Sequence, residues 1–296
     1  MAASATKRCA YLTMDDTAGW SIDAELAFPP MRELGWSVET VRWRMPPADW
    51  DAYDAVYIGT PWDYPEDPER FLSLLETVDR SAAILVNDVA LVRWTMPKTY
   101  LRDLERRGAD IVPSLWYERW RDDRVARFFD EHDSERIIVK PVVSTNATDT
   151  YLLERQSADA DELRQAFATR PFVVQPFISN IRSEGEYSLF YFANEFSHAI
   201  RKVPRAADFR VQEEHGAQIS AVDPETRLLD AGRKVLRLVE PMPVYARVDF
   251  VRDDDGCFLL MELEVIEPSM YLRMDPEAPR KFAEAFDNYV QRKIRD

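Results

Sequence analysis

The sequence predicts an α/β domain followed by α+β layers. Over the first ninety residues, short apolar runs alternate with amphipathic segments, which is typical of a parallel sheet covered by helices. Farther along, strand-like runs come in pairs joined by short turns, which favours antiparallel hairpins. The chain of 296 residues is about twice the length of a typical domain, so we expect two or three domains.

Composition and charge argue for a folded globular protein and against some classes of partner. Hydrophobic residues make up 46% and charged residues 31% of the chain, as in folded globular proteins. The net charge of −15 argues against nucleic acid or an anionic membrane as a partner, because both attract basic surfaces. The sequence has no run of about 18 apolar residues and no long apolar segment before its first strand, so we expect a cytoplasmic protein. Cys9 and Cys257 are far apart and not in a CxxC motif, so we expect reduced thiols.

The first part of the chain is predicted to form a parallel sheet with helices on its faces. In order, we expect a strand at 9–13, a helix at 21–35 ending at Gly35, a strand at 36–43, a strand and turn at 53–64, a helix at 68–79 and a strand at 83–87. Ligands usually bind beyond the carboxyl ends of such strands, which here are the loops at 15–17 and 60–64.

The rest of the chain is predicted to begin with a helix at 97–107, where Pro97 suits the first turn and Gly108 the end. After an acidic, arginine-rich segment, we expect strands within 136–143, 150–155, 172–178, 187–203 and 244–266, and a final helix near 277–293. The last two strand segments are hairpins, which turn at Ala193–Glu195 and at Asp253–Gly256.

Glutamates within an apolar strand near the C-terminus form the first candidate site. Glu262 and Glu264 are two residues apart, so on a strand they face one side while Met261 and Leu263 face the other. Buried carboxylates are costly unless a positive group compensates them. An all-oxygen set of ligands suits Mg²⁺ or Mn²⁺ better than zinc.

The register of this hairpin brings a third carboxylate to the same face. If the turn spans 253–256, Asp249 lies opposite Leu260 and Arg247 lies opposite Glu262. Side chains that are diagonal across a sheet can converge on one point, so Asp249 joins the two glutamates as a metal ligand. The alternative is a solvated strand face on which Arg247 is a surface partner.

Lys140 and the loop after it are a candidate phosphate site. The chain has neither a GxxxxGK nor a GxGxxG motif, so neither a P-loop nor a dinucleotide fold is supported. Lys140 ends an apolar strand, where its ammonium would be desolvated without an anion, and the loop at 142–150 is rich in groups that bind phosphate oxygens. The alternative is a lysine that extends to the strand edge. The segment 173–178 ends a strand in a turn that contains proline, so its backbone N–H and C=O groups could bind the edge of a purine. The alternative is that it is an interdomain linker.

These features occur in the order found in ATP-grasp carboxylate–amine ligases, which the chain resembles from about residue 90 to 290. The series is Lys98, Lys140 within VKP, VVQPFI at 173–178, ARVDF at 246–250 and MELEVIEPS at 261–269. The last motif resembles the D-alanine–D-alanine ligase pattern, and HAIRKVPRAADFRVQEEHG at 198–216 is similar to a segment of ribosomal-protein glutamate ligases. The layout, including TPWDY and LVRWTMPKTYL, most resembles the glutathione-synthetase-like group that contains the cyclo-ligase of D-cycloserine biosynthesis.

The resemblance implies an ATP-grasp fold behind an N-terminal parallel-sheet domain, with domains at residues 1–95, 96–178 and 179–296. It implies an ATP site formed by Lys98, Lys140, Ser144, Gln175, Pro176, Phe177, Ile178, Glu184 and Glu186. It implies a metal site for Mg²⁺, with Mn²⁺ as an alternative, on Asp249, Glu262 and Glu264. Developing charge on the reacting groups would be stabilised by Arg247, Lys202 and Arg210.

The chain departs from the family pattern at two places. Glu264 stands where many relatives have asparagine, which adds a negative charge and bears on the number or kind of metal ions. The loop after Lys140 has no glycine, which leaves its mobility and its phosphate contacts open. The histidines are expected to be structural or on the surface; they are His132, His198 and His215.

The substrates are expected between the first domain and the last. Fold logic gives the candidate contacts as Asp15, Asp16, Trp62 and Tyr64 on one wall, with Glu267 and Ser269 on the other. The aromatic residues of TPWDY are equally consistent with a hydrophobic interface patch. Glu267 falls after the strand, beside Pro268, so we assign it to a substrate amine rather than to the metal.

The implied reaction is the phosphorylation of a small carboxylate, of the amino-acid or peptide type, by ATP. An amine then attacks the acyl phosphate, and ADP and phosphate are released. The alternatives are an intramolecular cyclo-ligase of natural-product biosynthesis, a non-catalytic nucleotide-binding module, and a hydrolase that uses paired carboxylates. The partners are then a small-molecule carboxylate and an amine, and a homodimer is the common state of such enzymes.

Overall fold

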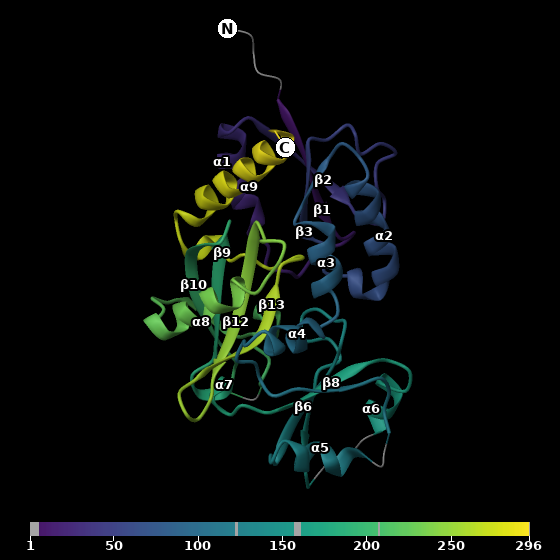
Figure 1. Cartoon of the computed structure of the whole chain (residues 1–296), viewed down its shortest axis with the longest axis vertical. Helices are drawn as coiled ribbons and strands as arrows, with labels where there is room; N and C mark the ends of the chain where they lie inside the picture. Colours follow the sequence, from purple (N-terminus) through teal and green to yellow (C-terminus); the bar gives the residue numbers. More distant parts are fainter. Residues whose placement is uncertain (1–5, 122–123, 157–160, 207, 296) are drawn as a thin grey trace.

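Three sheets form the framework of the molecule. The computed structural model describes residues 6–121, 124–156, 161–206 and 208–295. Strands assemble in the orders β2-β1-β3-β4, β11-β10-β9-β12-β13 and β5-β8-β6-β7. Figure 1 shows the three sheets following one another along the long axis, with both termini at the end that holds the first sheet. The predicted combination of a parallel α/β part with α+β layers is confirmed.

The N-terminal sheet is parallel, as predicted. Its strands are β1 (Lys7–Thr13), β2 (Trp36–Arg42), β3 (Ala55–Thr60) and β4 (Ile84–Val86). The helices around it are α1 (Phe28–Glu33), α2 (Pro68–Asp79) and α3 (Val89–Thr95). Helix α2 begins where expected because the Asp67 side chain accepts a hydrogen bond from the Arg70 N–H and Pro68 occupies the first turn.

The predicted helices at 21–35 and 97–107 are shorter in the structure. The first is divided into a 3₁₀ turn at Ala24–Ala27 and helix α1, because Pro29 and Pro30 fit only the first turn of a helix. The second is α4 (Tyr100–Arg106).

The two remaining sheets are antiparallel. The five-stranded sheet contains β9 (Glu186–Phe192), β10 (Glu195–Val203), β11 (Gln218–Ala221), β12 (Tyr245–Arg252) and β13 (Phe258–Glu264). The small sheet contains β5 (Leu115–Tyr117), β6 (Arg136–Pro141), β7 (Tyr151–Glu154) and β8 (Phe172–Pro176). The other helices are α5 (Val125–Glu131), α6 (Asp161–Ala166), α7 (Asn180–Ser183), α8 (Thr226–Leu236) and α9 (Ala278–Arg295). We propose domain boundaries near residues 95 and 178, between the strands of successive sheets.

One hydrophobic cluster joins the first sheet to the five-stranded sheet. It includes Trp36 and Tyr57 from the first sheet, Tyr245 from β12, and Phe282 and Phe286 from α9, all at most 2% exposed. Helix α9 therefore packs its apolar face against both sheets, which fixes their relative position.

A buried hydroxyl group strengthens the same junction. The Tyr245 oxygen lies 3.1 Å from the backbone carbonyl of Ile58, 3.2 Å from that of Val86 and 2.9 Å from that of Ile266. Because Tyr245 is fully buried, these carbonyls supply the partner that its hydroxyl hydrogen needs.

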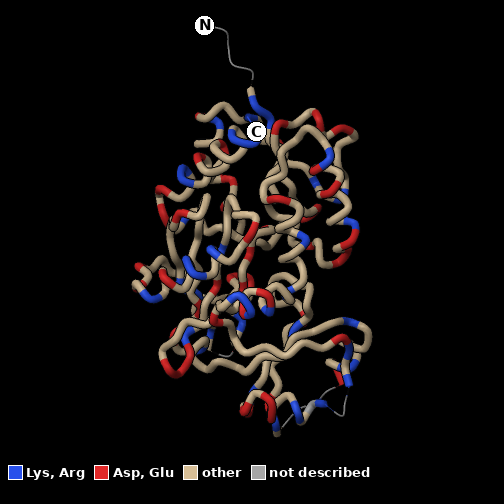
Figure 2. The backbone as a smooth tube through the Cα atoms, viewed as in Figure 1, with Lys and Arg blue, Asp and Glu red and all other residues tan. Residues whose placement is uncertain are grey.

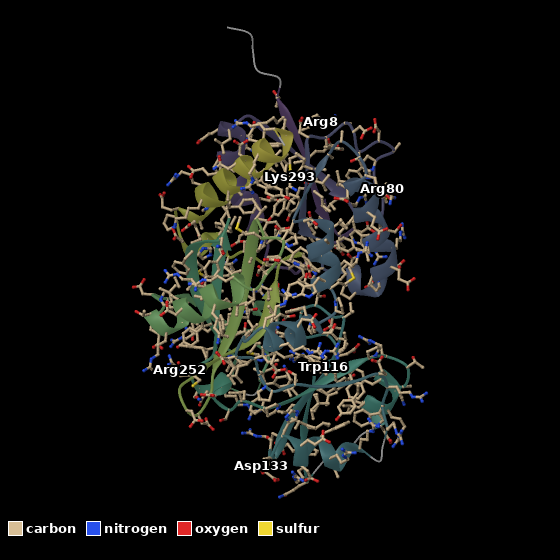
Figure 3. All side chains as sticks on the ribbon, viewed as in Figure 1. Arg8, Arg80, Trp116, Asp133, Arg252 and Lys293 are labelled. Atoms are coloured by element: carbon tan, nitrogen blue, oxygen red, sulfur yellow. The ribbon has the colours of Figure 1, made fainter. Side chains whose placement is uncertain are left out.

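Side chains fill the space between the sheets. Figure 3 labels Trp116 on β5, where the small sheet faces the rest of the molecule, and Asp133 at the far end of that sheet. Figure 2 shows acidic and basic residues interspersed in all three parts. Within the described ranges, no helix is both long and apolar enough to cross a membrane.

Candidate active site

A single cavity brings together most of the side chains that the sequence singled out. It is lined by residues of the first part of the chain, of the small sheet and of the five-stranded sheet. The predicted residues that line it are Trp62, Tyr64, Lys98, Lys140, Ser144, Gln175, Pro176, Phe177, Ile178, Glu186, Lys202, Arg210, Arg247, Glu262, Glu264, Glu267 and Ser269. Asp249 lies buried beside the cavity, in contact with Arg247.

One end of the cavity is apolar. Its walls are formed by Val112, Ile138, Phe177, Ile178, Ile181, Phe209, Val211, Val251 and Met261. At this end, the Gln175 side chain is buried and donates a hydrogen bond of 2.9 Å to the Ser114 hydroxyl, which fixes its orientation. An apolar slot with backbone groups at its edge suits a flat heterocyclic ring.

Two lysines, Lys98 and Lys140, line the same cavity as the carboxylates. The Lys98 ammonium lies 2.8 Å from a Glu262 oxygen and donates to the backbone carbonyl of Ser144 at 2.9 Å. Lys140 lines the cavity and forms no ion pair with any described residue. Burial lowers the pKa of Lys140, with the positive charge of Lys98 acting in the same direction. An anion in the cavity would relieve this cost.

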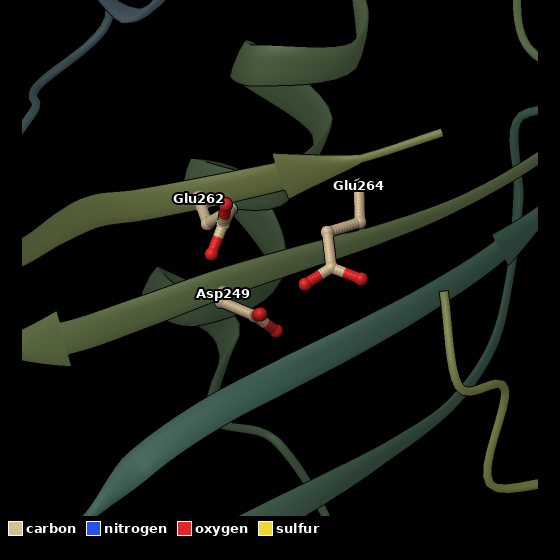
Figure 4. A group of neighbouring side chains, drawn as sticks. All are labelled: Asp249, Glu262 and Glu264. Atoms are coloured by element: carbon tan, nitrogen blue, oxygen red, sulfur yellow. The ribbon is translucent and has the colours of Figure 1, made fainter. Parts of the chain in front are cut away.

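The predicted carboxylate cluster is confirmed. Ligand oxygens of Asp249, Glu262 and Glu264 all lie within 4.8 Å of one another. Figure 4 shows that the three side chains leave adjacent strands and face the same space. The donor set is entirely oxygen, so these residues fit a hard divalent cation such as Mg²⁺.

The register of the hairpin differs from the prediction. Asp249 pairs with Glu262 and Arg247 pairs with Glu264, rather than with Leu260 and Glu262. The turn shifts the pairing by one residue, because Gly256 adopts a left-handed conformation and the Asp253 carboxylate accepts the Cys257 N–H.

A β-bulge adds a second shift. The pairs Phe250–Leu260 and Asp249–Glu262 leave Met261 without a partner of its own on β12. Both Met261 and Glu262 therefore line the cavity, although they are neighbours in sequence. The expectation that Met261 faces the opposite side is wrong for this reason, while the predicted meeting of the three carboxylates is correct.

Cations of the chain compensate the carboxylates. The Arg247 guanidinium donates to both oxygens of Asp249 at 3.0 and 3.1 Å and also pairs with Glu264. Lys202 pairs with Glu186 and lies 3.7 Å from Asp249. The Ser188 hydroxyl donates to Asp249 at 2.6 Å.

The pKa values of the carboxylates follow from these neighbours. Burial opposes ionisation of both Asp249 and Glu262, but nearby cations outweigh it and lower both pKa values. The cations are Arg247 and Lys202 for Asp249, and Lys98 and Lys140 for Glu262. Burial raises the pKa of Glu264 to about 7, against the opposing charge of Arg247.

An aromatic wall closes the end of the cavity that faces the first domain. The Trp62 indole donates from Nε1 to the backbone carbonyl of Glu267 at 2.8 Å, and the Thr145 hydroxyl donates to the backbone carbonyl of Trp62 at 2.8 Å. Trp20 packs against Trp62 with ring centroids 4.8 Å apart. Arg247 donates to the backbone carbonyl of Ser269 at 3.3 Å. The phosphate-site loop and the segment after β13 therefore meet at Trp62.

Comparison with known proteins found similarity in sequence and in structure. Residues 9–87 match the family described as D-cycloserine synthetase DcsG, N-terminal domain. The cycloserine biosynthesis protein DcsG of Streptomyces lavendulae is 29% identical over 286 residues, which cover 90% of this chain and 94% of that protein.

Solved structures agree over nearly the whole chain. The crystal structure of D-cycloserine synthetase DcsG superposes with a TM-score of 0.84 at 25% identity, covering 96% of this chain and 99% of the other. The D-alanine–D-alanine ligase from Bacillus anthracis gives 0.67 at 14% identity, covering 97% and 98%. The ATP-grasp ligase PsnB gives 0.65 at 15% identity, covering 96% and 98%. The chain has the fold of the ATP-grasp ligases.

Besides Asp249, three of the predicted site residues do not line the cavity. Asp15 is exposed and lies 3.9 Å from Arg42, and the Asp16 carboxylate accepts the N–H of Ala18 at 2.9 Å. Neither aspartate lines the cavity.

Glu184 is the third of these residues. It accepts from Arg252 at 2.8 Å and from the Tyr187 hydroxyl at 2.7 Å. Gly185, with a φ of +96°, redirects the chain between Glu184 and Glu186, so only Glu186 reaches the cavity.

Some residues that line the cavity were missed by sequence reasoning. They include Trp20, Phe209, Glu214 and Tyr271. Trp20 follows the first strand within the loop region that fold logic selected, three residues beyond the segment named there. Nothing local in the sequence distinguishes Tyr271, which reaches the cavity from a left-handed conformation with a φ of +47°.

No described histidine or cysteine is among the residues that line the cavity. His198 is buried, stacks on Phe190 with centroids 4.2 Å apart, and lies 3.0 Å from the backbone carbonyl of Met270. His132 and His215 also contact backbone carbonyls. The cysteines Cys9 and Cys257 are both free.

Proposed function

We propose that this ATP-grasp ligase activates a small carboxylate of the amino-acid or peptide type and joins it to an amine nitrogen. The observation that carries the proposal is the meeting, in one cavity, of an apolar slot, a lysine pair and a carboxylate cluster. The slot suits a purine, the lysines suit phosphates and the carboxylates suit a metal ion. A metal-bound nucleoside triphosphate carries the three groups that these features suit.

The nucleotide is assigned to the apolar slot and the lysines. Residues 175–178 form the edge that meets the adenine, and Glu186 lies near the ribose or phosphates. Lys98, Lys140 and the Ser144 region bind the phosphate oxygens. Lys140 is the best placed of these cations, because it forms no ion pair with a described side chain and is already desolvated.

The metal is assigned to Asp249, Glu262 and Glu264, with Mg²⁺ as the expected ion and Mn²⁺ as an alternative. When bound there, the ion neutralises phosphate charge and so supports phosphoryl transfer. Glu264, where relatives often have asparagine, gives the site a third carboxylate, and its ionisation is favoured when a cation is present.

Residues of the chain then guide two substitution steps. The substrate carboxylate oxygen attacks the γ-phosphorus of ATP and the bond to ADP breaks, which gives an acyl phosphate. The amine nitrogen attacks the acyl carbon, phosphate leaves and the nitrogen loses a proton. Arg247, Lys202 and Arg210 stabilise the negative charge that develops on oxygen in both steps.

A second candidate is ring closure within one substrate. It is favoured by the similarity to D-cycloserine synthetase over most of the chain. In this case the amine and the carboxylate belong to one molecule, and the product has lost one water relative to the substrate. A homodimer and a cytoplasmic location remain part of the proposal, to be checked by light scattering and by fractionation of cells.

Trapping with hydroxylamine tests the activation step without knowledge of the amine. Acyl phosphates react with hydroxylamine to give hydroxamates, so a panel of carboxylates with ATP and Mg²⁺ should yield ADP and a coloured iron–hydroxamate complex for the correct acid. Release of ADP without any hydroxamate, across the panel, would argue against an acyl phosphate. Mass spectrometry of the product without added amine distinguishes ring closure, which removes one water, from ligation.

A further inference from the structure

Glu267 is a buried carboxylate without a partner. It is 8% exposed and lines the cavity. Its side-chain oxygens form no hydrogen bond and no ion pair with any residue that the structure describes, whereas Asp249, Glu262 and Glu264 all do. A carboxylate in such a place is costly unless a positive group meets it.

The nearby cations of the chain are committed to other groups. Lys98 is held by Glu262 and by the backbone carbonyl of Ser144. Arg247 is held by Asp249, by Glu264 and by the backbone carbonyl of Ser269. The positive group that Glu267 requires is therefore left to a ligand.

The surroundings of Glu267 suit an organic cation. Trp62 is fixed beside it through the bond from Nε1 to the Glu267 backbone carbonyl, and Trp20 packs on Trp62. Both rings line the same cavity, as does Tyr64. The charge of Glu267 contributes, after burial, to raising the pKa of Tyr64, which indicates that the two groups are close. Aromatic faces attract ammonium groups, and a carboxylate accepts their N–H bonds.

We propose that Glu267, with Trp62 and Trp20, forms a subsite for a protonated amine carried by the carboxylate substrate. The proposal rests on the proposed ligase function and adds the substrate class, an amino acid whose ammonium group is not the reacting nitrogen. A protonated amine has no lone pair, so the nitrogen held at Glu267 cannot attack the acyl phosphate. The attacking nitrogen is a second, neutral amine.

Binding of matched acids tests this subsite. The probes are D-alanine against D-lactate and D-serine against D-glycerate, with their L enantiomers, measured by calorimetry with a non-hydrolysable ATP analogue and Mg²⁺. We expect the amino member of at least one pair to bind at least tenfold more tightly. Glu267→Gln should bring that ratio close to one while the affinity for the ATP analogue stays within twofold. The exposed Glu277→Gln should change neither quantity.

A second variant separates the aromatic contribution. Trp62→Leu keeps the carboxylate and removes the ring, so the ratio should fall by about threefold to tenfold. Equal binding of amino and hydroxy acids by the wild type, no binding of any amino acid, or an unchanged ratio in Glu267→Gln would each overturn the proposal.

The two proposals fail in different ways. Hydroxamate formed equally well from amino and hydroxy acids would refute the subsite and keep the ligase function. An amino preference that is lost in Glu267→Gln, together with no hydroxamate from any acid, would keep the subsite and refute the activation step.

Discussion

The ammonium of Lys98 lies 2.8 Å from the carboxylate of Glu262, so a proposed phosphate ligand and a proposed metal ligand form one ion pair. Metal-bound ATP offers each of them a new partner: the phosphates for Lys98 and the metal for Glu262. The two side chains are therefore already positioned, before ATP binds, to contact its phosphates and its metal ion.

Replacing Glu262 should remove metal binding. We expect Glu262→Gln to lower the rate of ADP formation by at least about 100-fold and to raise the Mg²⁺ concentration needed for half-maximal activity, because an amide is a weaker ligand than a carboxylate. Steady-state assays across a Mg²⁺ titration measure both. The exposed Glu195→Gln serves as the matched control, and an active Glu262→Gln enzyme with ordinary Mg²⁺ dependence would refute the metal assignment.

Substitution by methionine should change the melting temperature differently at Lys140 and at Lys98. Lys140→Met removes an unpaired, desolvated ammonium, so the free protein should melt at a temperature equal to or higher than that of the wild type. Lys98→Met leaves Glu262 without its ion pair and should lower the melting temperature. Both variants should raise the KM for ATP by about tenfold or more, since each loses a phosphate contact. A destabilised Lys140→Met with normal KM would contradict the assignment.

The buried His198 should make stability depend on acid pH. Burial lowers its pKa from an ordinary value of 6.5 to about 4, so the unfolded chain binds a proton more readily than the folded chain. The stabilising effect is complete above pH 6.5 and is lost as the pH falls toward 4. Over this pH range, the urea concentration at the midpoint of unfolding should fall less for His198→Gln than for the wild type. Parallel curves for the two proteins would contradict the assignment of this pKa.

The hydrogen bond from Thr145 to Trp62 should help to position the residues that contact the substrate carboxylate. Thr145→Val deletes the hydrogen bond to the Trp62 backbone carbonyl and should raise the KM for the carboxylate by about threefold to tenfold, which corresponds to one ordinary hydrogen bond. Thr145→Ser keeps the hydroxyl and should restore the wild-type value. Failure of serine to restore it would mean that the methyl group, rather than the hydroxyl, matters.

The Tyr245 hydroxyl should hold the first sheet to the five-stranded sheet. Tyr245→Phe leaves buried carbonyls of Ile58, Val86 and Ile266 without this donor, and we expect a loss of about 1–2 kcal/mol in the free energy of unfolding. Urea denaturation measures it. Tyr289→Phe removes a hydroxyl that makes no hydrogen bond with a described residue and should change stability by less than about 0.5 kcal/mol.

The fold could be predicted well from the sequence because hydrophobic periodicity and turn residues act locally. Helix α2 has its cap at Asp67 and its proline at the first turn, and both hairpins form where the sequence indicated. The carboxylate cluster could also be predicted, since alternation along β12 and β13 brings ligands to one face.

The remaining features depend on contacts that no local pattern contains. The bulge at Met261 depends on the partner strand, and the turn toward Glu186 depends on the conformation of Gly185. Trp20 reaches the cavity only because it packs on Trp62, more than forty residues later. Lys98 and Lys202 pair with residues of other strands, so the sequence indicated the charges but not their partners.

Because of the bulge in β13, two residues that are neighbours in the sequence both line the cavity. Met261 belongs to the apolar slot and Glu262 to the carboxylate cluster, yet adjacent codons specify them. Recombination rarely separates neighbouring codons, so the proposed base-facing contact and the proposed metal ligand are inherited together. Directed evolution of nucleotide preference at position 261 can therefore explore apolar side chains of different size while the neighbouring carboxylate keeps its place in the strand pairing.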